Sequence, residues 1–207
     1  MSAVELHTEK KSLVDISQLA ATLNYFHPLG NDIEQFLQSH AYGCSFGRGK
    51  LILKAGQICE QVYFIRKGAV RGFVRDRQKD ITTWITADNE LVTSISALDR
   101  EEPALENMQA IEDCEMLALN LLDLKSLYQQ FPEFNIVVRK LLQQYYRDAE
   151  GRAFIARLTS AESKYKYFIT YYSHLVNRIP LKYVASFLGI TLETLSRVRK
   201  KISVERG

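Results

Sequence analysis

Hydrogen-bonding and basic side chains crowd the end of the chain, in the stretch "YVASFLGITLETLSRVRKKI" at residues 183–202. Four of them recur at spacings of three and four residues: Glu193, Ser196, Arg197 and Lys200. This spacing places them on one face of a helix. Carboxylate, hydroxyl and guanidinium groups suit the base edges and phosphates of DNA. The pattern predicts a DNA-contacting helix, and the alternative is a surface helical hairpin with a solvated basic rim.

The neighbours of this face have the types that a helix-turn-helix requires. Gly189 tolerates the positive φ of a tight turn, and Ala185, four residues earlier, permits close helix contact. Thr191 stands where the second helix needs an N-cap. Apolar residues occupy the inward positions: Val184, Leu188, Ile190, Leu195 and Val198. The predicted DNA-binding residues are Lys182, Tyr183, Thr191, Leu192, Glu193, Ser196, Arg197, Arg199 and Lys200.

Within this set, we expect two kinds of DNA contact. Glu193, Ser196 and Arg197 are placed to read bases. The residues expected to hold phosphates are Lys182, Tyr183, Arg199 and Lys200. Charge supports a polyanionic partner, because residues 139–207 carry a net charge of +9 and residues 1–138 carry −6. The alternative is that these charges belong to solvated helix faces.

Three segments of the chain have different residue patterns, and together they predict an α+β fold. Residues from about 12 to 40 favour short helices, and residues 42–119 favour short antiparallel strands that form a β-roll, a double-stranded β-helix. From residue 120 the pattern is helical, with Asn120 as an expected cap. We predict an N-terminal helical and β-roll sensor domain over residues 1–131, a long helix over 132–158 and a DNA-binding unit over 159–207.

Apolar residues recur at threes and fours along the long helix. The stripe predicted to form a homodimer interface comprises Ile136, Val137, Leu141, Tyr145 and Ala149. The alternative is a monomeric helix that packs on its own roll.

Cysteine and histidine usage gives no sign of a metal centre. Cys44, Cys59 and Cys114 are odd in number and form no CxxC pair, so we expect no disulfide framework and no zinc site. No cysteine precedes residue 44, and the histidines are scattered, so neither an iron–sulfur cluster nor haem is expected. The apolar runs are short and no signal sequence is evident, which predicts a soluble cytoplasmic protein without a membrane partner.

Three segments together resemble the Crp/Fnr family of bacterial transcription regulators, in the form seen in Bacteroidetes-type bacteria. They read "LKAGQICEQVYFIRKGAVRGFV", "QAIEDCEMLAL" and "IPLKYVASFLGITLETLSRVRKKI". The resemblance implies a β-roll of the cyclic-nucleotide-binding type, a long dimerisation helix and a winged helix-turn-helix. It also implies a homodimer on a pseudo-palindromic operator in double-stranded DNA, with RNA polymerase as a candidate further partner.

Two departures from the family pattern bear on function. Nucleotide-binding members carry Gly-Glu and Arg-Ser pairs, whereas Val92, Thr93 and Ser94 stand at the first and Ala104 and Leu105 near the second. Arg100 nearby is flanked by acidic residues, so we expect no cAMP or cGMP binding, and the effector stays unknown. Leu192 stands where many members have a guanine-binding Arg, so the operator is expected to differ.

These observations predict a sequence-specific DNA-binding transcription regulator that acts as a homodimer and does not respond to cAMP. The alternative is a small-molecule sensor module whose DNA binding is vestigial. An enzyme of the cupin type would need a histidine and carboxylate metal cluster, and residues 42–119 contain no histidine. We therefore expect no enzymatic activity.

Overall fold

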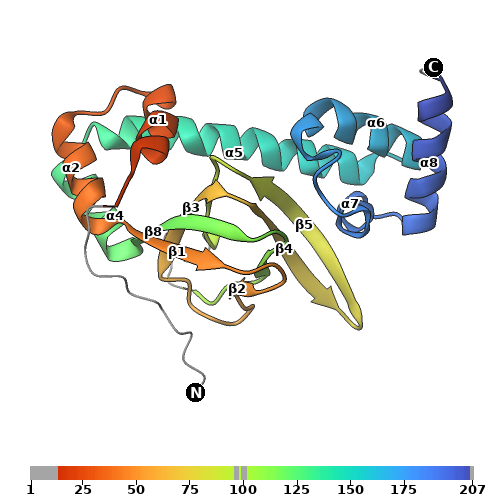
Figure 1. Ribbon diagram of the computed structural model, residues 1–207, viewed down its shortest axis with the longest axis horizontal. Helices are drawn as coiled ribbons and strands as arrows, with labels where there is room; N and C mark the ends of the chain where they lie inside the picture. Colours follow the sequence, from red (N-terminus) through yellow and green to blue (C-terminus); the bar gives the residue numbers. More distant parts are fainter. Residues whose placement is uncertain (1–13, 96–97, 99–101, 206–207) are drawn as a thin grey trace.

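The computed structural model describes residues 14–95, 98 and 102–205 (Figure 1). Two helices, α1 (Ser17–Phe26) and α2 (Asn31–His40), open this part of the chain, as predicted for residues 12–40. Each buries one apolar stripe, with Leu23 3% and Ile33 1% exposed. The two stripes pack into one cluster with the start of the long helix, so the N-terminal helices are part of the main body.

Two four-stranded antiparallel sheets form the predicted β-roll. The first sheet has the order β1 (Tyr42–Phe46), β8 (Cys114–Asn120), β3 (Gln61–Lys67) and β6 (Leu91–Val92). The second has the order β2 (Leu51–Leu53), β7 (Asn107–Ala110), β4 (Ala69–Asp76) and β5 (Lys79–Ala87). Ile65, Val70 and Met108 lie between the sheets and are at most 1% exposed. The roll leaves β5 as an edge strand of the second sheet.

Helix α4 (Leu121–Gln130) follows β8, and its cap is the predicted one, because Asn120 Oδ1 accepts a hydrogen bond from Leu122 N at 2.8 Å. Helix α5 (Phe134–Arg157) then runs the length of the body (Figure 1). Phe134 and Val137 on its first turns are buried at 4% and 1% exposure. The first turns of α5 therefore pack against other elements of the same chain.

The C-terminal helices share a core with the roll. They are α6 (Ala161–Tyr171), the short 3-10 helix η1 (Ser173–Leu175), α7 (Leu181–Leu188) and α8 (Leu192–Glu205). Phe168 and Leu175 from this unit belong to one buried cluster with Ala69, Ile85 and Ile111 of the roll. The C-terminal helices therefore pack on the roll, and the domain boundary at residue 159 stays a prediction. Within the described residues, no helix has the length and apolar character needed to cross a bilayer.

The predicted wing is wrong for the part of the chain that the structure describes. A wing is made of β-strands, and no strand follows β8 in residues 121–205. Helix α8 continues to Glu205 instead. The C-terminal unit is all-helical in its described residues, and the presentation of α8 depends on helix packing alone.

Candidate nucleic-acid interface and ligand cavity

A left-handed glycine joins α7 to α8. Gly189 has φ 64° and ψ 37°, a conformation that costs little only for glycine. Its N–H bonds to Ser186 O at 3.1 Å, and Ile190 N bonds to Ala185 O at 3.0 Å. These two bonds form a Schellman motif, which satisfies the last carbonyls of α7. The sequence prediction of a turn at Gly189 is confirmed.

Thr191 caps α8, as the sequence predicted. Its Oγ1 accepts a hydrogen bond from Thr194 N at 3.1 Å. The inward faces are also those expected, since Val184, Leu188 and Leu195 are at most 1% exposed. Ala185 is 2% exposed at the contact between the helices. One face of each helix is therefore fixed in the core, which determines the face that α8 turns outward.

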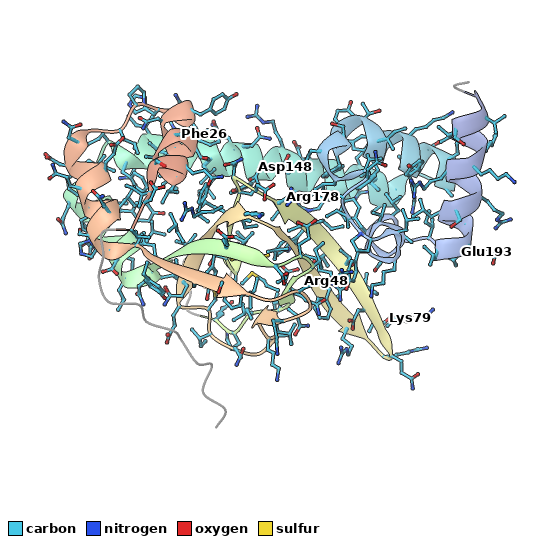
Figure 2. All side chains as sticks on the ribbon, in the orientation of Figure 1. Phe26, Arg48, Lys79, Asp148, Arg178 and Glu193 are labelled. Carbon is cyan, nitrogen blue, oxygen red and sulfur yellow. The ribbon has the colours of Figure 1, made fainter. Side chains whose placement is uncertain are left out.

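The outward face of α8 carries the polar residues predicted to contact DNA. Its exposed members are Thr191, Leu192, Glu193, Ser196, Arg197 and Lys200, and Arg199 is half-buried. The Glu193 and Arg197 side chains are 84% and 72% exposed and lie 4.0 Å apart. Figure 2 shows Glu193 at the far end of the molecule from the N-terminal helices. Exposed pairs of this kind contribute little to stability, so the face is free to contact a partner.

Lys182 and Tyr183 differ from each other in their surroundings. Lys182 is exposed, and its ammonium lies 4.8 Å from the centre of the Tyr183 ring. The guanidinium of Arg71 on β4 lies 4.4 Å from the same ring. Tyr183 is half-buried against the roll by this cation–π contact. The phosphate contacts predicted for Lys182 and Tyr183 stay predictions, and Tyr183 also packs against the roll.

Helix α7 is bonded directly to the free edge of β5. Ser186 Oγ accepts a hydrogen bond from Thr82 N at 2.9 Å and donates one to Asp80 O at 3.1 Å. A hydroxyl has the donor and acceptor needed to take the place of a neighbouring strand at this point. These bonds hold the helix before the turn against the roll.

Arg178, in the segment before α7, clamps the C-terminal unit to three loops of the roll. Its Nη2 donates to Gly68 O at 2.9 Å, Asp88 Oδ1 at 3.0 Å and Glu112 Oε2 at 2.7 Å. The pairing with Asp88 and then Glu112 raises the pKa of Arg178, and the same contact lowers the pKa of Asp88. Sequence patterns did not reveal this clamp, since its partners lie far away along the chain.

The predicted dimer stripe is partly wrong. Val137 is 1% exposed in the core of its own chain, and the hydroxyl of Tyr145 is bonded to both N and O of Leu91. Ile136, Leu141 and Ala149 are half-buried. The exposed apolar residues of α5 are one position further on, with Leu142 47% and Tyr146 68% exposed. Helical periodicity located an apolar stripe, but Val137 and Tyr145 of that stripe are engaged within their own chain, and the interface role of Ile136, Leu141 and Ala149 stays a prediction.

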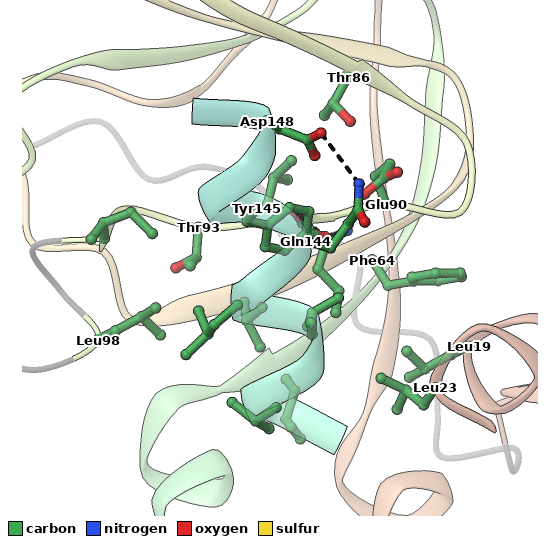
Figure 3. A pocket seen from close by; sticks show the side chains of 18 of the residues that line it. Leu19, Leu23, Phe64, Thr86, Glu90, Thr93, Leu98, Gln144, Tyr145 and Asp148 are labelled. Atoms are coloured by element: carbon green, nitrogen blue, oxygen red, sulfur yellow. Dashed lines mark hydrogen bonds between the residues drawn. The ribbon is translucent and has the colours of Figure 1, made fainter. Parts of the chain in front are cut away.

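A cavity of about 470 Å³ lies between the roll, the N-terminal helices and α5 (Figure 3). Apolar side chains from all of these elements line most of it, including Leu19, Leu23, Phe64, Leu119, Leu124 and Val138. At one end the lining is polar, with Thr86, Glu90, Gln144 and Asp148. The sequence analysis did not locate this cavity, because its walls come from segments spread over more than 100 residues.

A tight turn connects the cavity with the clamp. Asp88 bonds to Arg178, while Glu90, two residues later, lines the cavity. Asn89 between them has a left-handed φ of 68°, and its Oδ1 accepts a hydrogen bond from Gln18 Nε2 of α1 at 2.7 Å. Helix α1 therefore holds the turn through Asn89, while Asp88 bonds to Arg178 and Glu90 lines the cavity.

Part of the chain is similar to a known protein family. Residues 44–131 match the family model described as the cyclic nucleotide-binding domain. The match covers the β-roll and helix α4, less than half of the chain. No curated protein matches the sequence.

Solved structures extend the likeness beyond that domain. FixK2 from Bradyrhizobium japonicum superimposes with a TM-score of 0.69 over 80% of this chain and 85% of its own, at 16% identity. A protein from Eubacterium rectale described as a Crp/Fnr transcriptional regulator gives 0.67 over 86% and 85%, at 14% identity. The c-di-GMP responsive regulator CLP of Xanthomonas campestris gives 0.65 over 85% and 93%, at 13% identity. The chain has the fold of the Crp/Fnr regulators.

The segment that matches the cyclic nucleotide-binding domain has no arginine at the described positions where the resemblance places the phosphate site. Ala104 is 3% exposed, Leu105 is 85% exposed, and Thr93 Oγ1 donates to the backbone oxygen of Gln61 at 2.9 Å. Arg100 lies outside the described residues. No cluster of metal-ligating side chains occurs among the residues described.

Proposed function

We propose that the protein is a sequence-specific DNA-binding transcription regulator. The observation that carries this proposal is the outward polar face of α8, which the Gly189 turn and the Thr191 cap present away from the body. In this arrangement α8 enters the major groove, where Glu193, Ser196 and Arg197 contact base edges. Lys182, Arg199 and Lys200 then contact phosphates.

The regulator acts as a homodimer in this proposal. Leu142 and Tyr146 on the exposed face of α5 form the centre of the interface, and the half-buried Leu141 and Ala149 flank it. A two-fold axis along α5 would place the two copies of α8 about 34 Å apart, one turn of DNA. The operator is then a pseudo-palindrome. Tyr146→Glu is expected to yield a monomer in analytical ultracentrifugation, and a persistent dimer would reject this interface.

The central experiment selects fragments bound by the protein from random DNA. We expect one enriched motif, and Arg197→Ala is expected to weaken binding to it by about 1–3 kcal/mol with little loss on random DNA. Lys200→Ala serves as the matched control, because loss of a phosphate contact weakens binding to all sequences and lowers the salt slope by about 1. Equal losses for Arg197→Ala on both kinds of DNA would contradict base reading.

A sensor module with vestigial DNA binding is the second candidate, and the cavity of about 470 Å³ is the observation that favours it. The fragment selection separates the two candidates, because a vestigial α8 would enrich no motif. In neither case do we expect cAMP to be the ligand, and calorimetric titration with cAMP should show no saturable binding. We expect no catalytic activity.

A further inference from the structure

The cavity beside α5 has the size and lining of a small-molecule site. Its volume of about 470 Å³ lies within the range of about 300–1,000 Å³ that is usual for ligand pockets. Most of its wall is apolar, and Figure 3 shows Leu19 and Leu23 on the side away from the polar end, with Phe64 closer to Glu90. Such a wall favours an organic molecule with a hydrocarbon body.

The polar end of the cavity is acidic. Glu90 and Asp148 are half-buried there, and Gln144 Nε2 donates to Asp148 Oδ1 at 3.3 Å. Burial raises the pKa of both carboxyls, and the nearby Asp148 raises that of Glu90 further. In the described part of the chain, neither carboxylate is in an ion pair. A shielded carboxylate that is in no ion pair is stabilised by a cation placed directly beside it.

The positive groups at this end do not cancel the acids. Arg152 and His174 also line the cavity. Burial and then the nearby Arg178 lower the pKa of His174, which disfavours its charged form. Arg152 and then Arg147 act against the raised pKa of Asp148, whereas the charge that acts on the pKa of Glu90 is that of Asp148. Glu106, a further acid in the lining, is bonded to Thr83 and to the indole N–H of Trp84, each at 2.6 Å.

We propose that this cavity binds a small molecule with an apolar body and a protonated amine, whose ammonium lies between Glu90 and Asp148. The hydrocarbon part occupies the space lined by α1, β3 and α5. A cyclic nucleotide has the opposite character, since its phosphate would meet two carboxylates. The inference deepens the proposed sensor role of the roll and rests on that role, but it does not require α8 to bind DNA.

The only tryptophan of the chain provides a direct readout. Trp84 lines the cavity, so its fluorescence reports a molecule that enters. We would titrate the protein at pH 7 with hexylammonium, hexanol and hexanoate, which share a chain length and differ in charge. The expected result is a saturable signal with a Kd for hexylammonium at least tenfold below that for hexanoate. Equal or tighter binding of hexanoate, or no saturation with any probe, would overturn the proposal.

Two variants test whether the carboxylates set this preference. Glu90→Gln combined with Asp148→Asn should reduce the preference to less than threefold, and each single change should give an intermediate value. Glu150→Gln is the matched control, because Glu150 is exposed on the same helix two residues away. A tenfold preference that survives in the double variant would reject the proposed site. Because these titrations contain no DNA, their failure leaves the DNA-binding proposal standing, and the fragment selection tests that proposal separately.

Discussion

The two polar surfaces of the molecule differ in how water reaches them. On α8, Glu193 and Arg197 are 84% and 72% exposed, and water solvates both charges. At the end of the cavity, Glu90 and Asp148 are half-buried, and burial raises the pKa of both. Solvated charges contribute little to folding, whereas shielded charges reduce stability unless something pairs with them. Removal of a charge should therefore change the free energy of unfolding little on α8 and should raise it at the end of the cavity.

The largest expected effect is at the clamp that joins the two regions. Arg178→Ala leaves Asp88 and Glu112 without their cation, each about 30% exposed, so we expect a loss of about 2–3 kcal/mol in the free energy of unfolding. Urea unfolding measures this loss. Arg178→Lys keeps the charge but not the planar fork, and should recover only part of it. A loss below about 0.5 kcal/mol would show that the Arg178 clamp does not stabilise the packing of the C-terminal unit on the roll.

A smaller effect is expected where α5 meets the cavity. Tyr145→Phe removes the hydroxyl that bonds Leu91 N at 2.9 Å and Leu91 O at 3.2 Å, which should cost about 1–2 kcal/mol. Thermal and urea unfolding would both register the change. The control is Tyr146→Phe, one position along and 68% exposed, for which a change within about 0.5 kcal/mol is expected. Equal effects of the two changes would argue against a buried role for the Tyr145 hydroxyl.

At the turn before α8, the expected effect is smaller again. Gly189→Ala places a Cβ on a left-handed residue, which should destabilise the protein by about 1 kcal/mol. Gly47→Ala is a fitting control, since Gly47 does not have a positive φ and its added Cβ would make only ordinary contacts, at 3.9 Å and beyond. Stability that is unchanged or increased in Gly189→Ala would mean that the turn is not held in this conformation.

At Asp148, the test of the comparison is the direction in which stability changes with pH, and not the size of the change. Its folded pKa is raised by burial, so the folded state binds the proton more tightly than the unfolded state. The stability from Asp148 is then greatest below its unfolded pKa, near 3.8, and is lost as the pH rises through the folded value. Asp148→Asn should flatten that part of the pH–stability curve without destabilising the protein at pH 7, as measured by urea unfolding at a series of pH values, and an unchanged slope in the variant would contradict the burial of this carboxyl.

Local features of the structure could be predicted from the sequence, and long-range ones could not. The Gly189 turn, the Thr191 cap and the roll follow from residue types within a few positions of one another. Arg178 and Gly68 are 110 residues apart, and nothing in either neighbourhood indicates the other. Periodicity marked the stripe that contains Val137 and Tyr145, but it cannot tell whether a stripe packs on its own chain or on a second copy. The cavity was missed for the same reason, since no single segment contains it.

The turn at residues 88–90 has a thermodynamic consequence. Asp88 is bonded to the C-terminal unit and Glu90 borders the cavity, while Gln18 fixes Asn89 between them. Any displacement of this short backbone segment changes both neighbours at once. If a ligand in the cavity shifts the turn and thereby changes the affinity of α8 for DNA by some factor, then DNA changes the affinity for that ligand by the same factor, because binding linkage is reciprocal.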